Sequence, residues 1–131
     1  GIIASVVQVE IGKRNRLKIE KVDIVVDFGK IINPDIVLSQ VEGSVVMGIS
    51  LALKEEITFH DGRVSQSNYD DYRIARMKDC PDINVTIIES DEDVRGIDGS
   101  LMPILPAITN AIYAASGKRI RKLPIGKQKL V

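Results

Sequence analysis

Few side chains in this sequence could take part directly in a reaction. The chain has one histidine, His60, and one cysteine, Cys80. A site with several histidines, a four-cysteine metal site and an internal disulfide are therefore excluded within this chain. His60 is followed by Asp61-Gly62 between two strand-like runs, which predicts an exposed residue in a hairpin turn. Cys80 has no histidine near it in the sequence, so we interpret it as a structural or incidental thiol.

One carboxylate lies in a context that suits chemistry. Asp98 stands in the loop Gly96-Ile97-Asp98-Gly99-Ser100, shortly before a helical pattern. A lone carboxylate in a glycine-bracketed loop before a helix is a candidate for a chemical role. Aspartate in such a loop is more often a turn or capping residue, and on the residues alone both interpretations stay open.

The first half of the chain predicts a hairpin and a helix. The run 7–11 alternates apolar and polar residues, and the run 17–26 is rich in β-branched residues, so together they predict two antiparallel strands. From 37 to 54 the apolar spacing becomes that of an amphipathic helix. Asn33 is its expected N-cap, and Pro34 occupies the first turn, where its missing N–H costs nothing.

The second half predicts three further strands and a closing helix. Two short runs flank Asp61-Gly62, a third strand pattern covers 83–88, and a helical pattern begins at Pro103 and stops at Gly117. The order β-β-α-β-β-β-α predicts an α+β fold, an antiparallel sheet with two helices packed on it. We expect a single domain over residues 1–131, and the start in mid-strand predicts a piece of a longer polypeptide.

Composition restricts the classes of partner. The 131 residues are 44% hydrophobic, and 18 basic side chains balance 18 acidic ones. This balance gives no general attraction for nucleic acid. No uninterrupted apolar run approaches the roughly 20 residues of a membrane helix, so no membrane segment is predicted, and no targeting signal decides the compartment. The basic run 117–131 leaves open an unrelated α+β protein that binds an anionic partner with steep salt dependence.

Three motifs occur in a fixed order along the chain. They are VDFGKIINP at 26–34, SQVEG at 39–43 with Gly48 after it, and PILPAITNAI at 103–112 running into SGKRIR at 116–121. In this order they resemble the C-terminal part of the molybdenum-cofactor subunit of the xanthine dehydrogenase and aldehyde oxidase family. The bacterial isoquinoline 1-oxidoreductase beta-subunit branch is the most similar. The resemblance covers about residues 5–125.

The resemblance implies a molybdenum hydroxylase that oxidises an N-heterocycle or an aldehyde with oxygen derived from water. In that family a molybdenum–molybdopterin cofactor carries the redox chemistry, and the protein orients the substrate and places a base. The partners that it implies are the rest of the large subunit and a small [2Fe–2S] subunit. The chain alone is expected to hold no stable cofactor and to be inactive, and the isolated domain could self-associate through apolar surface.

The resemblance also assigns candidate site residues. Gln40 matches a glutamine that lies near the cofactor, and its amide can both donate and accept hydrogen bonds. Gly43 and Gly99 are the other residues expected at the cofactor. Asp98 matches the family's glutamate base, but no proline follows it and its side chain is shorter by about 1 Å, a misplacement that can cost roughly a hundredfold in rate. A non-catalytic assembly or binding module on the same fold is therefore the alternative.

Overall fold

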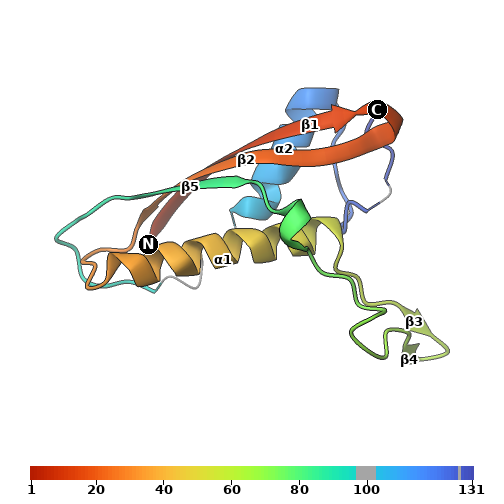
Figure 1. Cartoon of the computed structure of the whole chain (residues 1–131), viewed down its shortest axis with the longest axis horizontal. Coiled ribbons are helices and arrows are strands. Elements are labelled where there is room, and N and C mark those ends of the chain that lie inside the picture. The colour runs from red at the N-terminus through yellow and green to blue at the C-terminus, as the bar shows by residue number, and fades with distance from the viewer. Residues whose placement is uncertain (97–102, 127) are drawn as a thin grey trace.

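The computed structural model describes residues 1–96, 103–126 and 128–131 (Figure 1). Within these ranges, seven helices and strands follow in the order expected from the sequence, so the α+β class is confirmed. They are β1 (Ile2–Gly12), β2 (Arg16–Asp27), α1 (Pro34–Leu53), β3 (Phe59–His60), β4 (Arg63–Val64), β5 (Asp82–Ile87) and α2 (Ile104–Ser116), with single 3₁₀ turns at Lys13–Asn15 and Met77–Asp79.

The main sheet has the order β1-β2-β5, and it is mixed. Strands β1 and β2 form the expected antiparallel hairpin, from the Ile2–Asp27 pair to the Gly12–Arg16 pair. Strand β5 instead runs parallel to β2, so the prediction of an all-antiparallel sheet is wrong. Helix α1 lies in the long connection between these strands, and this crossover returns the chain to the starting end of β2 before β5 begins. Strands β3 and β4 form a separate two-stranded sheet.

The core lies between the main sheet and the two helices. Helix α2 packs against β1, α1 packs against β5, and the helices also contact each other. The buried side chains recur at every second residue along the strands and at every third or fourth residue along the helices. The fully buried set includes Val22, Ile24 and Val26 from β2, Val41, Val45 and Ile49 from α1, and Ile104, Ile108 and Ile112 from α2.

The expected helix boundaries are confirmed. The Asn33 side-chain oxygen accepts hydrogen bonds from the backbone N–H groups of Asp35 at 3.1 Å and Ile36 at 3.3 Å. These two groups have no partner within the helix, so the cap stabilises its start. At the end of α2, Gly117 adopts a left-handed conformation with φ of 72°, and its N–H donates to the Tyr113 carbonyl at 2.7 Å.

Helix α1 is long and apolar enough to cross a membrane by length and composition alone. Its 18-residue window of highest hydropathy averages 1.7, and 44% of that window is buried inside the protein. The buried side chains Val41, Val45 and Ile49 face the sheet and α2. We therefore assign α1 to the core of the domain.

Burial on β2 allows a direct test of the core. Ile24 is 1% exposed, whereas its neighbour Val25 faces the other side of the sheet and is 36% exposed. We expect Ile24→Ala to lower the free energy of unfolding by about 2–4 kcal/mol, because it removes buried methyl groups and leaves a cavity. Val25→Ala is the matched control and should cost well under half as much. Urea unfolding followed by circular dichroism measures both, and equal losses would contradict this assignment of the two faces.

Candidate functional site

The ends of β2 and β5 are fastened together. The Asp27 carboxylate accepts a hydrogen bond from the Gly29 backbone N–H at 2.9 Å and another from the Ser90 hydroxyl at 2.9 Å. Three backbone hydrogen bonds continue the contact beyond the strands: Ile88 N–H to Val26 O at 2.8 Å, Lys30 N–H to Glu92 O at 2.9 Å, and Arg95 N–H to Phe28 O at 2.8 Å. We call residues 27–30 with 88–90 and 92–95 the clamp; Asp91 is exposed and is left out of this definition.

Gly29 is the residue that lets the clamp close. It adopts a φ of 76°, and a Cβ at this position would lie 2.8 Å from the Glu92 carbonyl oxygen and still closer to that of Asp93. Backbone cannot move away as a flexible side chain can, so any side chain here would push the two segments apart. The sequence motif VDFGKIINP therefore has a structural explanation at its glycine.

The Asp27 carboxylate is held in its charged form. The hydrogen bond from the Gly29 N–H, and then that from the Ser90 hydroxyl, lower the pKa of Asp27 below its ordinary value of 3.8. A hydrogen bond to the ionised form favours that form. The clamp therefore includes a carboxylate that stays ionised through the neutral range.

An apolar hollow of about 310 Å³ opens beside the clamp. Its walls are the loop 28–33, the first turn of α1 and the clamp residues Val94 and Arg95. Ile32 and Ile36 line it and are 88% and 63% exposed. Large apolar side chains exposed together on one surface are typical of a binding or contact region.

Gln40 and Gly43 lie on the exposed side of α1, and Gln40 is about one turn along the helix from Ile36 in the wall of this hollow. With Ile36 and Met47 they follow the spacing 36, 40, 43 and 47, which places all four on one stripe of the helix. Among the described residues, the Gln40 side chain has no hydrogen-bond partner, so both its donor and its acceptor face outward. A Cβ at Gly43 would meet no atom within 4 Å, so a flat group could approach the helix backbone there.

Asp98 and Gly99 lie outside the described residues, which stop at Gly96 and resume at Pro103. The chain is anchored on both sides of that gap. Arg95 belongs to the clamp, and the Pro103 carbonyl accepts a hydrogen bond from the Ser5 hydroxyl at 3.3 Å. The structure thus brings Gln40 and Gly43 together on one stripe, and it leaves their relation to Asp98 as a prediction.

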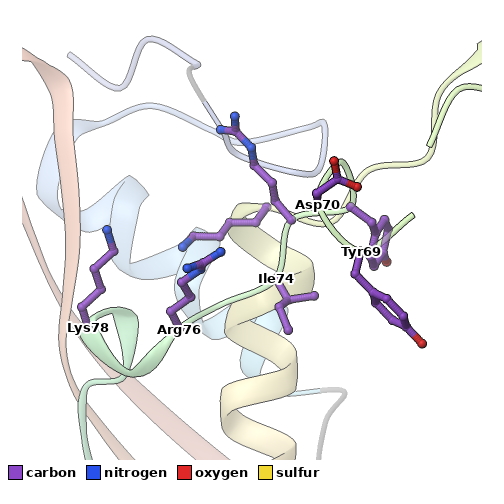
Figure 2. Close-up of a pocket in the computed structure, with 8 residues that line it drawn as sticks. Tyr69, Asp70, Ile74, Arg76 and Lys78 are labelled. Atoms are coloured by element: carbon purple, nitrogen blue, oxygen red, sulfur yellow. The ribbon is translucent and has the colours of Figure 1, made fainter. Parts of the chain in front are cut away.

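A second, larger hollow of about 700 Å³ lies at the other end of α1, and sequence reasoning missed it (Figure 2). Four cationic side chains line it, those of Lys54, Arg73, Arg76 and Lys78. They come from the end of α1 and from the segment before β5, so their proximity depends on the fold. Lys54 pairs with Asp79 and lowers the pKa of that carboxyl.

The expectations for the two reactive residue types can be compared with the structure. His60 is the last residue of β3, directly before the Asp61-Gly62 turn, and its side chain is 84% exposed, which confirms the predicted hairpin and the exposure of His60. Cys80 is a free, exposed thiol. Within the described residues no three His, Cys, Asp or Glu side chains come together as a possible metal site.

Comparison with known proteins connects these features to one family. Residues 1–81 match the family described as "Molybdopterin cofactor-binding domain". The chain is 38% identical over 112 residues to the isoquinoline 1-oxidoreductase subunit beta of Brevundimonas diminuta, an alignment with 85% of this chain and 14% of that protein. It is 33% identical over 125 residues to the nicotine 6-hydroxylase large subunit of Paenarthrobacter nicotinovorans, with 88% of this chain and 15% of that protein.

Solved structures agree with the sequence comparisons. The quinoline 2-oxidoreductase of Pseudomonas putida 86 superposes with a TM-score of 0.79 at 25% identity, over 90% of this chain and 16% of that chain. The chain thus spans about 14–16% of the length of these relatives. The arrangement of sheet and helices is shared with one region of much longer subunits.

The open space at Gly43 generates a stability prediction. We expect Gly43→Ala to raise the free energy of unfolding of this chain by about 0.5–1 kcal/mol, because alanine favours a helix interior and its methyl group meets nothing. Gly29→Ala is the contrasting variant and should lower stability, because its methyl group collides with backbone. Thermal and urea unfolding measure both. A loss of stability in Gly43→Ala would show that this face is covered in the chain itself.

The clamp predicts a pH dependence. Because folding lowers the pKa of Asp27, its contribution to stability is fully present above the ordinary value of 3.8 and is lost as the pH falls through the folded-state pKa. We therefore expect Asp27→Asn to be less stable than the unmodified chain at pH 6, with a difference that shrinks below pH 3.8. Asp91→Asn, in the exposed acidic segment, is the control for the loss of one negative charge. Urea midpoints between pH 3 and 7 test this, and a constant difference would contradict it.

Proposed function

Because the chain belongs to the molybdopterin cofactor-binding domain family, we propose that it forms one wall of the cofactor site in the large subunit of a molybdenum hydroxylase. The whole enzyme would oxidise an N-heterocycle or an aldehyde with oxygen derived from water. The observation that carries this proposal is the exposed stripe of α1, where Gln40 and Gly43 follow Ile36, a residue in the wall of the apolar hollow. Such a surface suits a flat, polar organic group placed against the helix.

The described residues are compatible with a molybdopterin cofactor. A pterin presents hydrogen-bond donors and acceptors along its edge, and the Gln40 amide can pair with both kinds. Gly43 leaves room for close approach to the helix, and no protein metal ligands are needed because the pterin itself holds the metal. When bound, the cofactor would supply the two-electron oxidation of the substrate carbon.

Asp98 is the proposed general base. Its carboxylate would accept a proton from the water-derived oxygen that attacks the substrate carbon. Gly99 next to it would allow close approach of the backbone to the cofactor. The clamp contributes by fixing residues 92–95, directly before this loop, to the end of β2. In this proposal the chain orients groups and holds one proton-accepting side chain, and the cofactor carries the electrons.

The proposed partners are the remainder of the large subunit and a small [2Fe–2S] subunit that would receive the electrons. The names of the relatives support this arrangement, since both are designated as subunits of larger enzymes. Each relative is also about seven times as long as the aligned segment, so the substrate channel would lie mostly in other parts of the large subunit.

The test uses the full-length subunit that contains this chain, produced with its small subunit in a molybdenum-competent host. We expect about one molybdenum and one pterin per polypeptide. Asp98→Ala should keep this content and lose at least a hundredfold in turnover of N-heterocycles or aldehydes, the typical contribution of a general base. Asp98→Glu should retain activity, because it keeps the carboxylate and restores the reach of the family's glutamate.

Matched variants make the result specific. Asp91→Ala removes a carboxylate from the exposed acidic segment and should leave turnover unchanged. Gln40→Ala should lower the pterin content, whereas Glu42→Ala, two residues along the same helix, should not. A folded subunit without molybdenum would overturn the proposal. Full activity in Asp98→Ala would favour the alternative, in which the domain serves assembly and another residue is the base.

A further inference from the structure

The β3–β4 hairpin extends away from the rest of the molecule (Figure 1). We call residues 56–71 the arm. Among these residues only Gln66 is partly buried, and the others are exposed. Its large apolar side chains are uncovered: Ile57 and Val64 are each 48% exposed, Phe59 is 71% exposed and Tyr69 is 95% exposed. Phe59 and Val64 are directly paired across the hairpin, so two of these side chains lie side by side.

The arm nevertheless has a defined conformation, because its polar groups bond to one another. The Gln66 amide bridges to Thr58, accepting from its backbone N–H at 2.8 Å and donating to its hydroxyl at 2.9 Å. The Asp71 carboxylate accepts from the backbone N–H groups of Ser67 at 2.8 Å and Asn68 at 3.1 Å. An isolated two-stranded hairpin is only marginally stable in water. Hydrogen bonds thus stabilise the conformation of the arm, whereas its apolar side chains remain exposed to solvent.

The base of the arm opens onto the hollow of about 700 Å³ described above, which we call the basic hollow. In Figure 2, Arg76 and Lys78 extend to the same side of the ribbon, and Tyr69 and Asp70 lie across from them. Lys54 is neutralised by Asp79. Within the described part of the chain, Arg73, Arg76 and Lys78 form no ion pair, and the lining adds one carboxylate, that of Asp70, so this surface keeps a net positive charge.

We propose that the arm and the basic hollow form one docking surface for a carboxylate-bearing, apolar-centred surface on the remainder of the same large subunit. This inference rests on the proposed function, since it requires the longer subunit. Phe59 and Tyr69 would act as aromatic anchors in an apolar pocket. Carboxylates on the opposing surface would pair with Arg73 and Arg76, and guanidinium groups can bind carboxylates through two parallel hydrogen bonds.

The charge pattern is the reason for this choice of occupant. In a symmetric dimer the same patch meets itself, so two copies would bring the net positive charges of two basic hollows together. An opposing surface of opposite charge avoids this repulsion. The relatives are about seven times as long as the segment they share with this chain, and that additional chain would be present at high effective concentration.

Hydrogen exchange tests the docking proposal on both forms of the protein. Amide exchange in peptides covering 56–71 is measured in the 131-residue chain and in the full-length subunit. We expect exchange at least tenfold slower in the full-length subunit, because docking covers the arm. Peptides from β2 serve as the internal reference and should change far less. Equal exchange of the arm in both forms would overturn the proposal, as would protection in the short chain that grows with its concentration and so indicates a second copy.

Variants of the full-length subunit test the chemistry of the surface. Phe59→Ser and the double variant Arg73→Glu with Lys78→Glu should each restore fast exchange in the arm. The control variant Arg121→Glu with Lys122→Glu changes the charge equally at another exposed site and should leave the protection intact. Protection that survives the Arg73/Lys78 reversal would overturn the proposal.

Molybdenum content separates this inference from the proposed function. A subunit with molybdenum and pterin but a rapidly exchanging arm overturns the docking proposal and leaves the function standing. A protected arm that responds to these variants, in a subunit without molybdenum, supports docking and overturns the function.

Discussion

The parallel pairing of β2 with β5 determines where the candidate site lies. Parallel strands end at the same edge of a sheet, so the residues that follow β2 and those that follow β5 leave that edge together. This is why Asp27 can bond both Gly29 and Ser90. The same pairing requires a crossover, and α1 begins in it at the Asn33 cap. The clamp, the apolar hollow and the first turns of α1 consequently meet at one end of the sheet.

Helix α1 serves two surfaces at once. Val41, Val45 and Ile49 are buried in the core, while Ile36, Gln40 and Met47 face outward. A helix that covers a sheet normally has a polar outer face, and one that is apolar on most sides is usually covered from several directions. The high hydropathy of α1 therefore has two sources. Its buried face belongs to the core, and its exposed face carries apolar side chains on a surface that would suit a cofactor or further protein.

Features set by neighbouring residues could be predicted from the sequence, and features set by long-range pairing could not. The Asn33 cap, the Gly117 helix end and the turn at Asp61-Gly62 each depend on a few adjacent residues, and the structure has all three. The direction of β5 depends on which strand it meets after a long crossover. The basic hollow joins Lys54 to residues about twenty positions later, and the close contact at Gly29 involves residues more than sixty positions away, so no local pattern reveals either.

If Asp98 is the base, as proposed above, the clamp also limits how this domain could compensate for an aspartate in place of the family's glutamate. The Arg95 N–H is bonded to the Phe28 carbonyl, and the backbone of Glu92 and Asp93 lies too close to Gly29 to shift inward. On the other side of the loop, the Pro103 carbonyl accepts a hydrogen bond from the Ser5 hydroxyl. Any backbone shift that restores the missing reach of about 1 Å must therefore arise between residues 96 and 103.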